Sequence, residues 1–169
     1  RAEGNHFDNL PDGVGKMCKL TELWLSGNKF SHIPACICEL TSLTRLRLSN
    51  NQLFEIPLTI TSLTSLNELW LDHNMLNVLP LAVGVLTRLD VLILDNDKFI
   101  SPPPEICHGG AKVVTQYLNV MEAGILTNQV DCSQLGLAAF PVEVLALSGL
   151  TALNLSGNHI AEIPGSVSL

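Results

Sequence analysis

The stretch LTRLRLSNNQL, residues 43–53, recurs almost unchanged 23 residues earlier as LTELWLSGNKF and 23 residues later as LNELWLDHNML. Each copy has leucine at its first, fourth and sixth positions and asparagine at its ninth. A motif that repeats at a fixed period is typical of repeat proteins, in which each repeat buries its apolar side chains against its neighbours. The sequence therefore predicts an array of stacked coils, one for each repeat.

The alternating leucines inside each copy indicate a strand with one buried face. In Leu46-Arg47-Leu48 every second residue is leucine, which is the period of a β-strand. Stacking would place such strands side by side, so we expect one parallel sheet in a right-handed solenoid of about six coils. Prolines after the strands turn the chain, and the short segments that follow them predict 3-10 or single helical turns on the convex side.

The spacing L-x-x-L-x-L-x-x-N-x-L resembles that of the leucine-rich-repeat family. The resemblance implies an α/β leucine-rich-repeat solenoid, with a curved parallel β-sheet on the concave side and short 3-10 or helical turns on the convex side. It also implies a non-catalytic surface that binds a protein or a peptide and needs no cofactor. An inserted α-helix, described below, is the expected departure from the regular fold.

An asparagine follows each predicted strand, where the backbone turns inward. A carboxamide both donates and accepts hydrogen bonds, so a buried asparagine can satisfy the backbone N–H and C=O groups that the turn leaves unpaired. Position 97 carries aspartate, which only accepts when ionised, and we expect the ladder to be weaker at that coil. The predicted structural ladder consists of Asn5, Asn28, Asn51, Asn74 and Asn158.

The repeat register breaks after residue 106 and resumes near residue 127. We therefore divide the chain into a first sub-array (1–106), a helical insertion (107–126) and a second sub-array (127–169). Apolar residues in the insertion recur at helical spacing as far as Gly124, before which the helix should end. Their face either packs back on the first sub-array as a cap or is held outward as a ligand for a partner's groove. The residues of this face are Val113, Val114, Tyr117, Leu118 and Met121.

Residues 102–118, from PPPEI through GG to YL, resemble the segment that ends the repeat arrays of Roco proteins, plant Ras-group repeat proteins and Ras-pathway scaffolds. These arrays are of the intracellular 23-residue type. The resemblance implies a scaffold or recognition segment of a larger signalling protein in the cytoplasm. Two alternatives stay open, namely a structural subunit of a large multiprotein assembly and the regulatory repeat arm of a kinase or GTPase.

Composition constrains the partner and the compartment. The 169 residues carry a net charge of -7, and their nine Lys and Arg residues are scattered, which disfavours nucleic acid and favours a basic protein surface as partner. The five cysteines lack the clustering of disulfide-bonded caps, so we expect a reducing compartment. Cys36 and Cys38 have no further ligands nearby, and we expect no metal site.

Two further expectations concern membrane spans and the ends of the chain. The sequence lacks an apolar run of about 18 residues, so no membrane span is expected in this segment. Residue 1 falls inside a repeat, and an uncapped coil would expose apolar side chains and an unpaired strand edge. We therefore expect further repeats or subunits to cover both ends.

Residues between the buried leucines should lie together on the exposed concave face. Trp24, Arg47 and Trp70 hold equivalent positions on strands roughly 4.8 Å apart, so the two indoles should flank the guanidinium. Tryptophan and arginine are enriched in binding hot spots, which favours a partner-binding face whose acidic end attracts basic groups. The alternative is a set of solvated cross-strand pairs worth ~0.2 to 1 kcal/mol each. The predicted partner-binding residues are Trp24, Arg45, Arg47, Glu68, Trp70, Asp72, Ile93 and Asp95.

No catalytic constellation is recognisable in the sequence. The five histidines fall on different faces of the predicted coils, and no Ser, Cys or Lys has a base at a readable spacing. Asp72, His73 and Asp95 could meet on adjacent strands, but such a cluster on a concave face is more often a polar rim than an active site. We therefore expect a non-enzymatic protein without catalytic residues.

Overall fold

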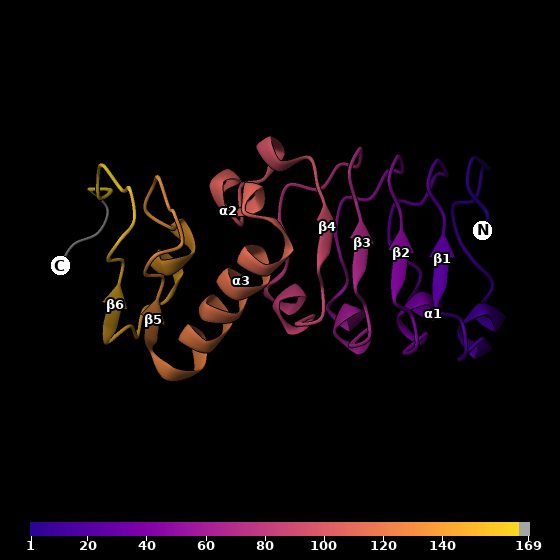
Figure 1. Ribbon diagram of the computed structural model, residues 1–169, viewed down its shortest axis with the longest axis horizontal. Coiled ribbons are helices and arrows are strands. Elements are labelled where there is room, and N and C mark those ends of the chain that lie inside the picture. Colours follow the sequence, from indigo (N-terminus) through magenta and orange to yellow (C-terminus); the bar gives the residue numbers. More distant parts are fainter. Residues whose placement is uncertain (166–169) are drawn as a thin grey trace.

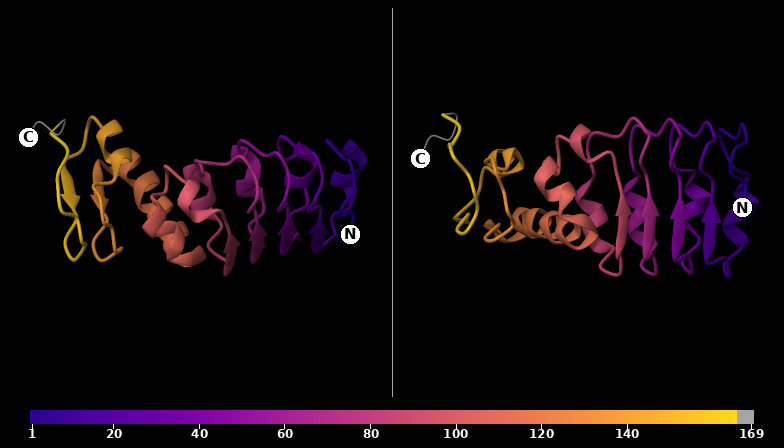
Figure 2. Two further views of the ribbon diagram at one scale, coloured as in Figure 1. Left: turned by 90° about the horizontal axis from the view of Figure 1, so that it is seen from above. Right: turned by 45° about the horizontal axis from the view of Figure 1, so that its top comes forward.

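The fold is an elongated stack of coils. Figure 1 shows the computed structural model, which describes residues 1–165. The coils follow one another along the long axis, and helix α3 (Gly110–Thr127) crosses between the coil of strand β4 (Val91–Ile93) and that of β5 (Gln129–Asp131). The views in Figure 2 show strands along one side of the stack and short helical segments along the other. The predicted solenoid is thus confirmed.

The strands form two parallel sheets. β1 (Glu22–Trp24), β2 (Arg45–Arg47), β3 (Glu68–Trp70) and β4 pair in sequence order, each residue opposite the one a repeat further on. β5 pairs separately with β6 (Ala152–Asn154). The prediction of one continuous sheet is wrong, because residues 114–116, where the next strand would fall, lie inside α3.

Short helical turns follow the prolines on the side opposite the sheet, as predicted. Pro11, Pro34, Pro57, Pro80 and Pro141 each stand immediately before one of them, because a fixed φ suits the entry of a helical turn. The turns are η1 (Asp12–Lys16), α1 (Ala35–Cys38), η2 (Leu58–Ser62), η3 (Leu81–Val85) and η5 (Val142–Ala146). A further 3-10 turn, η4 (Asn96–Lys98), follows β4.

The helical segment consists of α2 (Pro104–His108) and the longer α3, so it begins three residues before the predicted insertion at 107 and ends one residue after it. The expected helix end before Gly124 is wrong: α3 continues to Thr127 and is closed by Asn128 in the left-handed conformation (φ 57°), whose N–H donates to the Gly124 carbonyl. Gly124 lies inside the helix, at a position where a Cβ would collide with the Val130 side chain. It therefore marks a close contact with β5 and not a stop.

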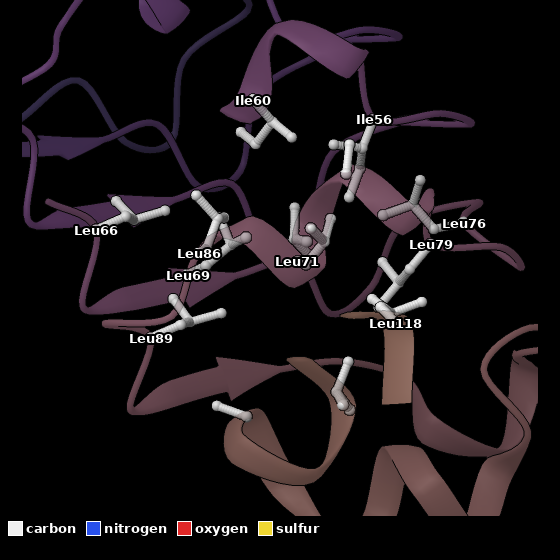
Figure 3. Close-up of a cluster of buried hydrophobic side chains, with 14 of the residues drawn as sticks. Ile56, Ile60, Leu66, Leu69, Leu71, Leu76, Leu79, Leu86, Leu89 and Leu118 are labelled. Carbon is white, nitrogen blue, oxygen red and sulfur yellow. The ribbon is translucent and has the colours of Figure 1, made fainter. Parts of the chain in front are cut away.

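One face of α3 completes the apolar core. Tyr117, Leu118, Val114 and Met121 are buried, and Val113 packs half-buried against them. Figure 3 shows Leu118 in a cluster with leucines from successive coils, including Leu71 and Leu89. The alternative in which this face is held outward for a partner is wrong, because the face is covered by the first sub-array and by β5.

Buried asparagines bridge neighbouring coils as a ladder. The Asn51 Oδ1 accepts the Phe30 N–H at 3.1 Å, and its Nδ2 donates to the Leu25 and Leu48 carbonyls at 3.1 and 3.0 Å. Asn28, Asn74 and Asn158 make equivalent bonds to their own and the preceding coil, whereas Asn5 is exposed and bonds only to carbonyls within its own coil.

Asp97 breaks the ladder at the coil of β4. Its side chain is 90% exposed and lies 3.4 Å from the Nε2 of His108 instead of reaching the preceding coil. A carboxylate could not donate to the carbonyls at the interior position, so the side chain stays in water.

Candidate functional site

The exposed side of the four-stranded sheet carries a row of stacked cations and indoles. Register places Trp24 opposite Arg47 and Arg47 opposite Trp70. The Arg47 Cζ lies 4.2 Å from the Trp24 ring centroid and 4.1 Å from that of Trp70, within cation–π distance of both. The sequence-predicted arrangement of these three side chains is the one found.

Arg1 extends this row by one coil. Its Cζ lies 3.4 Å from the Trp24 ring centroid. The backbone N–H of Ala2 donates to the Trp24 carbonyl, just as the N–H of Leu25, one repeat later, donates to the Arg47 carbonyl. We define the aromatic–arginine stack as Arg1, Trp24, Arg47 and Trp70. Our sequence reasoning missed Arg1, although it stands one 23-residue repeat before Trp24 and the same column would have found it.

Three N–H groups in the stack have no acceptor. The Nε1 atoms of Trp24 and Trp70 and the Nε of Arg47 are covered by neighbouring atoms and have no hydrogen-bond partner among residues 1–165. An unpaired buried donor costs about 1–3 kcal/mol, so an acceptor that reached these groups after a shift of the covering side chains would relieve this cost. Ring orientation sets this feature, and no sequence pattern encodes it.

A charge ladder runs beside the stack. The Arg45 guanidinium lies 2.6 Å from the Glu22 carboxylate and 3.0 Å from that of Glu68, and the Arg47 Nη2 lies 4.0 Å from Glu68. Hydrogen bonds from Arg45 to Glu22 and then to Glu68 raise the pKa of Arg45. Two arginines and two glutamates thus neutralise one another, and Glu68 is not a free anionic contact.

The acidic residues further along the face are also paired. The Ser49 hydroxyl donates to Asp72 at 2.5 Å, and the Asp72 carboxylate lies 2.8 Å from the His73 Nδ1. Asp95 accepts the His73 backbone N–H at 2.8 Å and lies 2.9 Å from the Lys98 Nζ. Burial alone would raise the pKa of Asp95, but these hydrogen bonds lower it overall. Asp72, His73 and Asp95 do meet here, as a rim of hydrogen bonds with one ion pair between Asp95 and Lys98.

Ile93 continues the column of the stack beyond Trp70. It lies opposite Trp70 in β4 and is 36% exposed, so it adds an apolar surface beside the last indole. The equivalent residues of the second sub-array, Asp131 and Asn154, lie in the separate β5–β6 sheet. All eight sequence-predicted residues therefore lie on the four-stranded sheet or at its edge, within one continuous face.

Three other features of the described residues concern disulfides, metal sites and membrane-spanning helices. Cys36 and Cys38 are buried in α1, and no disulfide joins any of the five cysteines. Among residues 1–165, no group of three or more His, Cys, Asp or Glu side chains is placed to hold a metal ion. In the same part of the chain, no helix has both the length and the apolar character required to cross a bilayer.

Comparisons with known proteins agree with the repeat architecture. Residues 3–53 and 149–168 match sequence models of the leucine-rich repeat. A search of curated proteins gave no significant match. Among solved structures, a leucine-rich-repeat protein of Leptospira interrogans is 28% identical with a TM-score of 0.55, over 95% of this chain and 43% of that one.

A second similar structure is that of an Arabidopsis receptor kinase. HAESA, solved in complex with the peptide hormone IDA and the co-receptor SERK1, is 30% identical with a TM-score of 0.51. The match covers 97% of this chain but 22% of HAESA. The chain therefore spans less than half of the length of either structure.

Proposed function

This chain is a leucine-rich-repeat protein, and we propose that it binds a protein or an extended peptide across the aromatic–arginine stack of its first sub-array. Leucine-rich-repeat domains generally act as protein-interaction modules, and HAESA was solved with a peptide hormone. The observation that carries the proposal is the stack itself, a half-buried row of the side chains that most often form binding hot spots.

The unpaired donors of the stack favour a partner that offers acceptors. Trp24, Arg47 and Trp70 each hold one N–H group without a partner. An extended peptide carries a carbonyl oxygen on every residue, and a small shift of the indoles would let these oxygens accept. Trp70 and the exposed Ile93 would supply the apolar contact that excludes water around such bonds.

We also propose that a basic partner is favoured, through the long-range field more than through direct ion pairs. Glu68, Asp72 and Asp95 already have partners within the chain, so they are poor direct anchors. The net charge of -7 still attracts cations from a distance and raises the association rate. The sequence-based expectation is that the acidic end of the face attracts basic groups. Here the attraction comes instead from the net charge of the whole chain.

Tryptophan fluorescence tests the binding face directly, because both tryptophans of the chain lie in the stack. Peptides selected from a displayed random library would be titrated against the parent and the Trp70→Ala variant. We expect Trp70→Ala to weaken binding by about 2 kcal/mol or more while unfolding near the parent midpoint. Phe54→Ala is the matched control, since Phe54 is exposed outside both sheets. Equal binding by the parent and by the Trp24→Ala and Trp70→Ala variants would reject the proposed face.

We further propose that this module belongs to a larger intracellular scaffold or recognition protein of a signalling pathway. Support comes from the resemblance of residues 102–118 to the array ends of Roco and Ras-pathway proteins and from five thiols without a disulfide. The test is the location of the tagged full-length protein in its own cells. A secreted product with oxidised cysteines would contradict the proposal.

A further inference from the structure

We propose a second binding site, separate from the sheet face, in the hollow where α3 joins the two sub-arrays: it takes a small apolar molecule that carries one ammonium group. The hollow has a volume of about 310 Å³. Such a volume is within the range of small-molecule sites, which occur preferentially where two structural units meet. We call this hollow the junction pocket.

The junction pocket is formed by three separate elements. Leu79 and Leu81 come from the entry to η3, Met121 and Ile125 from α3, and Leu147 from the residue after η5. The pocket exists because α3 replaces a regular coil, so η3 and η5 do not stack directly on each other. Figure 1 shows α3 running obliquely between the coils of β4 and β5. The lining is largely apolar, which favours an aliphatic or alicyclic ligand body.

Glu143 gives the pocket a single charge. Its Oε2 accepts the Tyr117 hydroxyl at 2.8 Å, and its Oε1 accepts the Ser101 hydroxyl. Both donors are neutral, and burial, followed by the nearby Glu143 charge, raises the pKa of Tyr117, so the phenol stays protonated. No Lys, Arg or His of residues 1–165 lies within ion-pair distance of Glu143.

This situation differs from that of the sheet-face acids. Glu22 and Glu68 share Arg45, and Asp95 has Lys98, whereas the half-buried Glu143 has no cation. A carboxylate offers about four acceptor positions, of which two hydroxyls use two. An ammonium group at the polar end of the pocket would supply both the missing charge and further donors. A carboxylate ligand such as a fatty acid would meet like charge.

Methyl NMR reports on the pocket because Met121 lines it and the other two methionines, Met17 and Met75, do not. The chain would be labelled with ¹³C at the methionine methyls and titrated with hexylammonium and, separately, with hexanoate. Hexylammonium should shift the Met121 signal with saturation and leave Met17 and Met75 unmoved. Hexanoate should bind at least about tenfold more weakly, the effect of one charge-assisted hydrogen bond.

Two variants locate the site. Glu143→Gln should weaken hexylammonium binding about tenfold and remove the preference over hexanoate. Glu55→Gln, which removes an exposed acid that does not line the pocket, should change neither value. Ala146→Phe, at an exposed lining residue, should block binding without loss of a core contact.

Three results would overturn the assignment. They are a Met121 signal that hexylammonium does not move, equal binding of hexanoate by the parent chain, and an unchanged titration after Ala146→Phe. None of them depends on the Glu143 variant being folded. The titration of the sheet face uses different residues and a different readout, so a negative result at one site does not contradict the proposal for the other.

Discussion

At the scale of single residues, the asparagine ladder shows how a side chain specifies the fold. Asn51 is buried, and it joins its coil to the preceding one by accepting the Phe30 N–H and donating to the Leu25 carbonyl, while it also donates to the Leu48 carbonyl of its own coil. The coil of β4 supplies the comparison, because the Asp97 side chain at the same position points to solvent. Donation, which aspartate cannot provide when ionised, is therefore what keeps the side chain inside.

The ladder predicts a large loss of stability for Asn51→Asp. The change removes the bonds that the Nδ2 donates and leaves the Leu25 and Leu48 carbonyls facing a carboxylate, at a cost of about 2–5 kcal/mol. Urea unfolding followed by tryptophan fluorescence measures it. Asn5→Asp is the control, because Asn5 is exposed and should stay within about 0.5 kcal/mol of the parent. Similar midpoints for the two variants would show that the ladder contributes little.

The cysteines provide a second prediction at this scale. Burial, followed by a nearby carboxylate, raises the pKa of Cys107 and of Cys132 to about 12, and burial raises the pKa of Cys36 and Cys38 as well. A thiol reagent such as dithionitrobenzoate, used at pH 8, should therefore react rapidly with the exposed Cys18 alone. The other four should react only on unfolding. Cys18→Ser should abolish the rapid phase, and rapid reaction of two or more thiols would contradict the burial.

The same thiols set the sign of a pH dependence. They ionise near their ordinary pKa of 9.0 when unfolded and only near 12 at Cys107 and Cys132 when folded, so the folded state disfavours the thiolate. Their effect on the free energy of unfolding should be absent below about pH 9 and should become a progressive loss as pH rises towards 12. A double Cys107→Ala, Cys132→Ala variant should lose less of its stability between pH 8 and pH 10.5 than the parent loses.

At the scale of elements, α3 is held by close approach to the turns on either side. A Cβ on Gly84 in η3 would lie 2.8 Å from the Asn119 Oδ1 and 2.9 Å from the Asn119 backbone N. Gly124 of α3 is similarly tight against Val130. Glu105 of α2 accepts the backbone N–H groups of Ala138 and Ala139, which ties α2 to the second sub-array. The helix is therefore a fixed joint between two repeat arrays.

Gly84→Ala tests this joint. The added methyl would push against the backbone of α3, which cannot move without disturbing its core contacts, and should cost about 1–3 kcal/mol of stability. Gly13→Ala, in the corresponding turn η1, is the control, because a Cβ there meets nothing within 4 Å. Urea midpoints would be compared. A Gly84→Ala variant as stable as the control would mean that α3 shifts freely on η3.

At the scale of the whole molecule, the regular coils could be predicted because each depends only on its own 23 residues and its neighbours. The same register placed Trp24, Arg47 and Trp70 in one row. The division into two sheets could not be predicted, since it depends on where α3 packs. The contacts of Asp72 with His73 and of Asp95 with Lys98 could not be predicted either, because they depend on side-chain torsions. The junction pocket arises from three elements that no periodicity relates.

Packing of α3 predicts how the two sub-arrays unfold. Stability in a repeat protein is roughly a sum of neighbour interfaces, so the coil of β5 is coupled to the first sub-array through α3. Tyr117 carries this coupling, because it is fully buried and also donates to Glu143 of η5. Tyr117→Ala should remove about 3–5 kcal/mol from this interface. It should leave the contacts among β1, β2 and β3 intact.

Two probes separate the sub-arrays, since both tryptophans lie in the first one while far-UV circular dichroism reports on the whole backbone. In the parent we expect the fluorescence and dichroism transitions in urea to coincide, as a coupled array requires. In Tyr117→Ala the dichroism transition should begin at lower urea, and amide hydrogen exchange should accelerate in β5 and β6 more than in β1 and β2. The exposed Phe54→Ala variant should keep coincident transitions. If Tyr117→Ala lowered both transitions equally, the chain would unfold as one unit, and α3 would belong to the core of both arrays instead of joining two separable ones.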